Sequence, residues 1–169
     1  MNFTLRPWTM NDLDSLVKHA NNPGISGRLT NKFPYPYTAE NAKNFIEFAT
    51  SKTPRNIMAI DINGEAVGGI GIHPQDDIQC MNAEMGYWLA EPYWGQGIMT
   101  DAIRQMVIYG FNNFGINRIF ARPFGNNVAS QKVLEKAGFM LEGRFEKTFF
   151  KNGEYLDELI YAVRKKQSS

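Results

Sequence analysis

A short turn with two glycines, Gly95 and Gly97, stands between an expected strand and an expected helix of this 169-residue chain. A helix that begins after such a turn leaves its first backbone N–H groups without partners inside the helix. These donors and the positive end of the helix dipole attract the oxygens of a phosphate group. Glycine also lets a ligand approach the backbone, because no Cβ stands in the way. The pattern indicates either a phosphate-binding site or a plain tight turn, since by itself it fits both.

The residues on either side of this turn show the periods of a strand and of a helix. Apolar residues alternate from Ala83 to Leu89, as in a half-buried strand, and Pro92 ends that pattern. From about Thr100 onward, apolar residues recur at spacings of three and four, and Gly115 is a plausible C-cap. The turn is therefore expected between the end of a strand and the start of a helix.

The rest of the chain predicts hairpins mixed with helices. The expected strands cover residues 3–7, 55–62, 66–73, 118–122, 139–150 and 155–163, and the expected helices cover residues 9–20, 38–49 and 127–137. Asn63-Gly64 and Asn152-Gly153 are typical of hairpin turns. Residues 24–37 are expected to be irregular, and residues 164–169 to form a solvated tail. This order has too many hairpins for a doubly wound sheet, in which strands and helices alternate throughout.

A second motif follows the strand expected at residues 118–122. It comprises an Asn127-x-x-Ser130 helix start and a Lys-Ala-Gly-Phe helix exit at residues 136–139. Together with the glycine turn, it resembles the GNAT superfamily of acyl-CoA-dependent N-acetyltransferases, and most closely the bacterial enzymes that acetylate the N-terminal amine of ribosomal proteins. The resemblance implies a single GNAT domain over residues 1–169. Its fold would be α/β (mixed α+β), with a mostly antiparallel central sheet, a splayed parallel pair of strands and flanking helices.

The resemblance also implies acetyl-CoA as the co-substrate. The pyrophosphate would bind backbone amides of the turn, and the pantetheine arm would pair with the end of the preceding strand like an added strand. The residues expected to contact acetyl-CoA are Leu89, Ala90, Gly95, Gln96, Gly97, Ile98, Met99, Thr100, Asn127 and Ser130. The chain departs from the family at Trp94, where Gln or Arg is usual, and at Met99, where Gly or Ala is usual.

The implied acceptor is an amine, and only its neutral form attacks a thioester. Glu84, on the strand before the turn, is the expected general base. Many members of the superfamily use a tyrosine to protonate the thiolate where this chain has Leu134, so the resemblance assigns that role to Ser130. An oxyanion donor would come from a backbone N–H near Leu89.

Each of these side chains also has a purely structural interpretation. Glu84 fits a solvent-facing position on a strand, and Asn127 fits the N-cap of its helix. Ser130 fits a helix serine that is hydrogen-bonded to its own backbone. The sequence leaves both interpretations open for all three.

Other residues carry weaker expectations. His73 has no second histidine nearby, so no metal site is expected, and Cys80 shows no sign of an activated thiol. His19 fits a surface residue near a helix end. The Asp157-Glu158 pattern fits a plain pair of surface carboxylates better than a binding site for a cationic acceptor. Three aromatic residues fit either the wall of an acceptor pocket or core packing, namely Phe33, Tyr35 and Tyr37.

The composition limits the remaining classes of function. The 18 Lys and Arg residues nearly balance the 17 Asp and Glu residues, so direct binding to nucleic acid is not expected. No apolar run reaches the roughly 20 residues that span a bilayer, and the N-terminal residues lack the features of a signal peptide. The single cysteine fits a reducing compartment, so the expected location is cytoplasmic.

Three functions remain. The leading hypothesis is an N-acetyltransferase that transfers an acetyl group from acetyl-CoA directly to a protein or peptide N-terminus. The second is acetylation of a small amine such as a polyamine, an amino acid or an aminoglycoside. The third is an acyl-CoA-binding sensor without turnover. The sequence leaves open whether the protein is a monomer or a homodimer.

Overall fold

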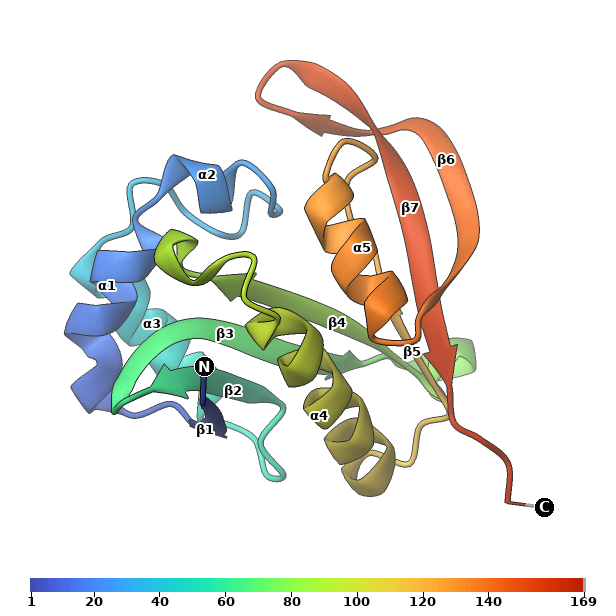
Figure 1. Cartoon of the computed structure of the whole chain (residues 1–169), viewed down its shortest axis with the longest axis horizontal. Coiled ribbons are helices and arrows are strands. Elements are labelled where there is room, and N and C mark those ends of the chain that lie inside the picture. The colour runs from blue at the N-terminus through green and yellow to red at the C-terminus, as the bar shows by residue number, and fades with distance from the viewer. Residues whose placement is uncertain (169) are drawn as a thin grey trace. The chain divides into compact units, whose positions relative to one another are not determined.

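A computed structural model describes residues 1–168 of the chain (Figure 1). These residues fall into two compact units, and two strands and one helix contribute to both. The first unit comprises Met1–Gly71 and Tyr87–Ala102. The second unit comprises Ile72–Gly86 and the residues from Ile103 onward.

Seven strands form a mixed sheet. They are β1 (Thr4–Pro7), β2 (Ile57–Ile62), β3 (Glu65–Pro74), β4 (Asn82–Leu89), β5 (Arg118–Ala121), β6 (Met140–Lys151) and β7 (Glu154–Arg164). Their order in the sheet is β1-β2-β3-β4-β5-β7-β6. The β4–β5 pair is parallel, whereas the β1–β2, β2–β3, β5–β7 and β6–β7 pairs are antiparallel. This confirms the mostly antiparallel sheet with one parallel pair that the family resemblance implies.

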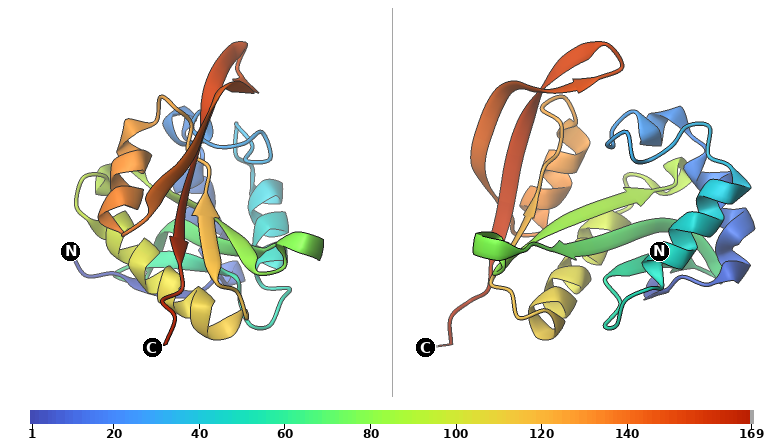
Figure 2. Two further views of the ribbon diagram at one scale, coloured as in Figure 1. Left: turned by 90° about the vertical axis from the view of Figure 1, so that its right-hand side faces the viewer. Right: turned by 180° about the vertical axis from the view of Figure 1, so that it is seen from behind.

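Two of the sheet connections are tight turns. Asn63 and Gly64 both have positive φ, 54° and 87°, between β2 and β3. Asn152 and Gly153 have φ of 51° and 79° between β6 and β7, which run side by side as a long hairpin (Figure 2). Asparagine tolerates this region and glycine enters it without strain, so both predicted hairpins are confirmed.

The core of the first unit gathers residues from three strands, from Ile25 of a short helix and from two longer helices. The longer helices are α1 (Leu13–Ala20) and α3 (Ala39–Ala49), whose inner faces are apolar. The Trp8 ring packs edge-on against Phe45 with centroids 5.4 Å apart. Thr38 caps α3 by accepting a hydrogen bond from the Asn41 N–H at 3.1 Å.

The region expected to be irregular contains one short helix, α2 (Pro23–Ser26). Asn22 caps it by accepting a hydrogen bond from the Gly24 N–H at 2.7 Å. Four residues are too few to show a helical period, so the sequence gives no sign of α2.

His19 is not the surface residue that the sequence predicts. Its side chain is only 10% exposed, and its Nε2 lies 2.8 Å from the Glu65 carboxylate at the start of β3. Lys18 contacts the same carboxylate at 2.8 Å. The prediction was wrong because helix position alone does not reveal a partner 46 residues away.

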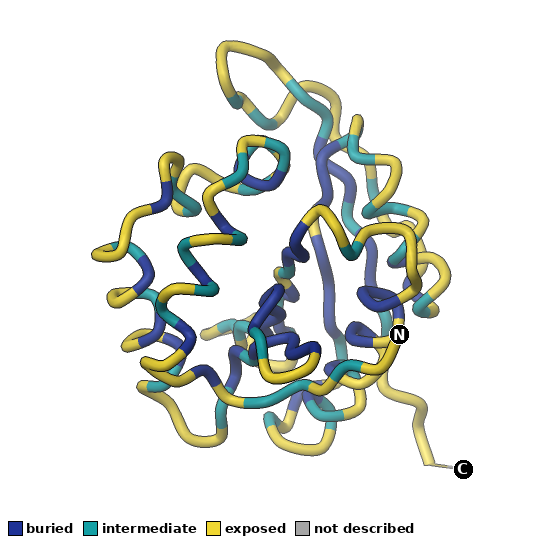
Figure 3. The backbone as a smooth tube through the Cα atoms, turned by 60° about the vertical axis from the view of Figure 1, so that its left-hand side comes forward, coloured by how far each residue is buried: buried dark blue, intermediate teal, exposed yellow. Residues whose placement is uncertain are grey.

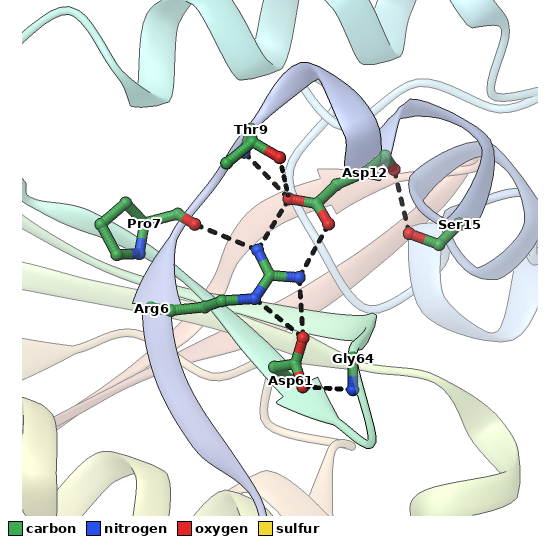
Figure 4. Close-up of polar contacts among 7 residues, drawn as sticks. All are labelled: Arg6, Pro7, Thr9, Asp12, Ser15, Asp61 and Gly64. Carbon is green, nitrogen blue, oxygen red and sulfur yellow. Dashed lines mark hydrogen bonds and ion pairs between the residues drawn. The ribbon is translucent and has the colours of Figure 1, made fainter.

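An arginine joins β1 to both the first helical turn and β2 in the first unit (Figure 4). The Arg6 guanidinium donates to both carboxylate oxygens of Asp12 at 2.8 Å and to Asp61 at 2.8 Å. Asp12 also accepts the Thr9 N–H at 2.9 Å at the start of η1 (Met10–Asp12), and Asp61 accepts the Gly64 N–H at 2.8 Å. Asp12 and Asp61 are both buried, so this network holds the start of the chain against β2.

Replacing Arg6 with methionine is expected to lower the free energy of unfolding by about 2 kcal/mol at pH 7, because two buried carboxylates lose their cation. Burial raises the pKa of Asp12, but its hydrogen bonds to Arg6 and Thr9 outweigh burial and hold this pKa below its ordinary value. The stabilisation is therefore complete above about pH 4 and is lost as the pH falls through the folded-state pKa. Urea unfolding should show a difference between the two proteins that shrinks in acid, and an undiminished difference would contradict this account.

The second unit contains most of α4 (Ile98–Asn113), which begins in the first unit, and all of α5 (Val128–Lys136). A Cβ on Gly110 of α4 would lie 2.5 Å from Ile72 Cδ1 and 3.2 Å from Ile119 Cδ1. The helix therefore packs closely on the sheet face that carries Ile119. Gly115 (φ 59°) and Gly138 (φ 95°) follow the ends of α4 and α5, as the sequence predicts.

The C-terminal residues differ in part from the predicted tail. Arg164 belongs to β7 and donates to Glu142 at 2.9 Å, and the Lys165 N–H donates to the Asn117 carbonyl at 2.8 Å. Ser169 lies outside the described residues. In contrast to β7, most of β6 is exposed, and the tip of the β6–β7 hairpin is mostly yellow in Figure 3.

Candidate functional site

The predicted site residues occupy three places: the glycine turn and the end of β4, the middle of β4, and the start of α5. No helix among residues 1–168 is long and apolar enough to cross a membrane. The same residues contain no group of three or more His, Cys, Asp or Glu side chains that could hold a metal ion.

The glycine turn lies in the first unit and has the backbone shape that a glycine pair allows. Gly95 and Gly97 have φ of 72° and 79°, in the left-handed region that most other residues enter only with strain. The helix α4 starts at Ile98, two residues earlier than the sequence predicts. The first backbone bond across its start runs from the Asp101 N–H to the Gly97 carbonyl, at 3.2 Å.

The backbone N–H groups of residues 96–100 make no hydrogen bond to another described residue. These five donors surround the N-terminal end of a 16-residue helix. Gln96 is exposed, whereas Ile98, Met99 and Thr100 are buried. The Met99 side chain therefore packs inside the protein and does not fill the turn. Unpartnered donors at a helix start suit an anion such as a phosphate.

Trp94, the unusual first residue of the turn, closes the turn against the end of β4. Its indole Nε1–H donates to the Leu89 carbonyl at 2.7 Å, and the Arg28 guanidinium lies 5.1 Å above its ring. Ala90 donates its N–H to the Val67 carbonyl at 2.8 Å and accepts the Tyr93 N–H at 3.0 Å. These contacts engage part of the backbone that is expected to pair with the pantetheine arm.

Glu84 lies in the second unit, where the parallel ladder between β4 and β5 ends. The paired residues are Asn82 with Arg118, Ala83 with Ile119 and Glu84 with Phe120. The Glu84 side chain is 30% exposed and forms an ion pair with Arg122, which donates at 3.0 Å through Nε and at 3.4 Å through Nη2. Glu84 is thus neither deeply buried nor a free surface carboxylate.

Arg122 also approaches a second carboxylate, that of Glu158 on β7, at 3.6 Å. Glu158 is only 8% exposed, so the prediction of a plain surface pair was wrong for this residue. Its neighbour Asp157 does pair near the surface, with Arg144 at 2.7 Å. Burial lowers the pKa of Arg122, but the two carboxylates outweigh burial and leave it raised.

Sequence reasoning missed Arg122 as part of this site. The sequence shows only that Arg122 directly follows a short strand, β5. Its closeness to Glu84 and Glu158 can be inferred only when β5 is known to lie between β4 and β7.

At the start of α5, Asn127 is the helix cap that its structural interpretation predicts. Its Oδ1 accepts the Ser130 N–H at 3.3 Å. Ser130 is partly buried, and Leu134, one turn later, is fully buried. A leucine side chain has no hydrogen-bond donor, so of these two residues only Ser130 can donate a hydrogen bond to a thiolate.

The aromatic residues near position 35 are divided between core and surface. Tyr37 is 4% exposed, and burial raises its pKa to about 12. Phe33 packs against Tyr37 and Trp88, with ring centroids 5.3 and 5.9 Å apart. Tyr35 is 56% exposed. Cys80 is an exposed free thiol.

Comparison with known proteins identifies relatives of the chain. The family described as "Acetyltransferase (GNAT) domain" matches residues 2–140. A putative ribosomal N-acetyltransferase of Bacillus subtilis, YdaF, is 32% identical over 105 residues, which cover 62% of this chain and 57% of that protein. A ribosomal-protein-serine acetyltransferase of Escherichia coli is 33% identical over 95 residues, covering 55% of this chain and 53% of that protein. The matches span little more than half the length of these relatives.

A solved structure shares the fold along nearly the whole chain. It is that of RimL, described as a ribosomal L7/L12 alpha-N-protein acetyltransferase in complex with coenzyme A. The two chains superpose with a TM-score of 0.83 and 23% identity, over 97% of this chain and 94% of that chain. At this identity, the likeness establishes the fold.

Proposed function

The chain belongs to the GNAT acetyltransferase domain family, and from that premise we propose that it transfers an acetyl group from acetyl-CoA to the N-terminal amine of a protein or peptide. The observation that carries the proposal is the glycine turn, whose five unpartnered N–H groups stand at the start of α4 inside the matched family region. Two relatives described as ribosomal-protein acetyltransferases favour a protein acceptor over a small amine.

In this proposal the turn from Gly95 to Thr100 binds the pyrophosphate of acetyl-CoA through its backbone donors. The end of β4 binds the pantetheine arm, and Leu89 contributes to that contact. Asn127 contributes from the start of α5, where its amide nitrogen remains available because only its oxygen caps the helix. These groups are polar and suit the phosphates and amides of the donor.

Glu84 acts as the general base, directly or through water, and accepts the proton of the attacking amine. The amine nitrogen forms the new C–N bond to the acetyl carbon, and the C–S bond breaks with its electron pair on sulfur. Ser130 donates a hydrogen bond to that departing thiolate. The step is a direct transfer, and no residue of the chain carries the acetyl group.

We also propose that the protein works in the cytoplasm. The chain has one cysteine, Cys80, which is exposed and has no partner for an internal disulfide. An exposed thiol of this kind persists most readily in a reducing compartment.

The proposal is tested by thiol release from acetyl-CoA against a panel of acceptors. The panel contains peptides with free Ala, Ser or Met N-termini, the same peptides blocked by formylation, polyamines, free amino acids and aminoglycosides. We expect turnover with at least one free peptide and none with its blocked form. Turnover confined to small amines would replace the proposed acceptor, and acetyl-CoA binding without any turnover would indicate a sensor.

A further inference from the structure

Three charged side chains lie together on one face of the sheet in the second unit. Glu84 pairs with Phe120 across the β4–β5 ladder, and Phe120 pairs with Ala162 of β7, so Glu84 and Glu158 lie on the same face because side chains alternate along β7. Arg122, the residue after the end of β5, contacts both carboxylates. Ile119, against which α4 packs, points to the opposite face.

Arg122 holds Glu84 at two points. Its Nε and Nη2 donate to the two carboxylate oxygens at 3.0 and 3.4 Å, which fixes both the position and the plane of the carboxylate. Its remaining terminal nitrogen, Nη1, faces Glu158 at 3.6 Å. The guanidinium is therefore shared between one half-exposed carboxylate and one buried carboxylate.

The negative charge of Glu158 is not needed for packing at this place in the sheet. Its side chain is 11% exposed, and its contact with Arg122 is its single ion pair among the described residues. A buried carboxylate with one long contact is costly, and a neutral side chain would pack there more easily. Its charge therefore calls for a role beyond packing.

We propose that Arg122 and Glu158 are positioning residues for Glu84: Arg122 orients its carboxylate, and Glu158 offsets the charge of the guanidinium from the other side. This inference rests on the proposed role of Glu84 as the general base. An arginine alone beside a carboxylate favours the ionised form and so weakens it as a proton acceptor. A second carboxylate on the other side of the guanidinium counteracts that effect.

Other charged groups near Glu84 could also influence its titration, so their contributions must be distinguished from those of Arg122 and Glu158. The Gln75 N–H donates to the Asn82 carbonyl at 2.9 Å, and this antiparallel register brings His73 of β3 opposite Glu84. On β5, Arg118 lies at the other end of the ladder and pairs with Glu142 at 2.6 Å. A His73→Gln variant therefore belongs in the experiment, because a histidine titrates in a pH range that could overlap the titration of Glu84 in the variants.

The test is a ¹³C NMR titration of the protein labelled at glutamate Cδ, with the Glu84 signal assigned by its loss in Glu84→Gln. We expect Arg122→Met to raise the midpoint of the Glu84 titration by about one pH unit, because a nearby positive charge is removed. Glu158→Gln should lower the midpoint by about half a unit, because the guanidinium is then less neutralised. The acid limb of kcat/KM against pH should move in the same two directions.

Two further variants separate charge from geometry and from general damage. Arg122→Lys keeps the charge but loses the two-point contact, so the midpoint should stay near that of the parent protein while kcat falls about tenfold. Arg144→Met removes an ion pair of the same type from Asp157 and should leave the Glu84 midpoint unchanged. Circular dichroism of each variant checks that the fold is retained.

The outcomes distinguish this inference from the proposed function. Unmoved midpoints, or shifts of the same sign in Arg122→Met and Glu158→Gln, would overturn the positioning roles even if Glu84→Gln is inactive. Full turnover of Glu84→Gln would overturn Glu84 as the base, whatever the midpoints show. Opposite shifts together with an inactive Glu84→Gln would support both.

Discussion

Replacing Glu84 with glutamine is expected to lower kcat by about a hundredfold at pH 7, while the affinity for acetyl-CoA stays within about twofold. Glutamine has nearly the same shape as glutamate but cannot accept a proton, so the substitution removes the base and little else. The glycine turn that we assign to the donor lies in a different part of the chain and keeps its N–H groups.

The rate should partly recover at high pH. More of the acceptor amine is neutral there, and the need for a base falls as the pH approaches the pKa of an α-amine, about 8. The measurement is kcat from thiol release between about pH 6 and 9, the range that spans this pKa, with acetyl-CoA affinity from calorimetry. Equal turnover of the two proteins at every pH would remove Glu84 from the mechanism.

Glu142→Gln is the matched control for this experiment. Glu142 is also a strand carboxylate of the second unit with an arginine partner, and contacts Arg118 at 2.6 Å and Arg164 at 2.9 Å. A similar loss of kcat in Glu142→Gln would show that the effect comes from ion pairing in the sheet and not from a base.

Replacing Gly97 with aspartate is expected to weaken acetyl-CoA binding by at least about a hundredfold, from backbone strain and charge repulsion together. Gly97 has φ of 79°, and a Cβ there would meet no atom within 4 Å, so a side chain fits in space but strains the backbone. The added carboxylate would also stand beside the N–H groups that we assign to the pyrophosphate and would repel it.

Gly97→Asn separates these two causes. Asparagine tolerates positive φ and has the shape of aspartate without its charge. We expect Gly97→Asn to bind acetyl-CoA about tenfold more tightly than Gly97→Asp. Calorimetry at two salt concentrations should show that this difference in affinity decreases at higher salt, because salt screens the repulsion. Equal affinities of the two variants would mean that no phosphate lies near residue 97.

Gly153→Asp controls for the strain itself. Gly153 has the same φ of 79°, is exposed in the β6–β7 turn, and a Cβ added to it would also meet no atom within 4 Å. This variant should lose stability to a similar extent and still bind acetyl-CoA. A comparable loss of binding in Gly153→Asp would indicate general destabilisation.

Much of the fold follows from local patterns in the sequence. Alternating apolar residues define β4, and Asn-Gly pairs define two hairpin turns, because backbone geometry at these positions depends on neighbours in the chain. Glycines at 95 and 97 similarly predict the turn before α4. The same local reasoning fails for α2, which is too short to show a period, and for His19, whose partner Glu65 is distant in sequence.

The sequence by itself determined the order of the strands and longer helices and the glycine turn, since each depends on residue type and short spacing, and its resemblance to the GNAT superfamily suggested Glu84 as the candidate base. Only the tertiary structure decided what surrounds that carboxylate. Arg122 and Glu158 lie far along the chain from Glu84 and come together because β5 pairs with β4 on one side and with β7 on the other. Charges separated so far along the chain interact only through that pairing, because electrostatic interaction depends on distance in space.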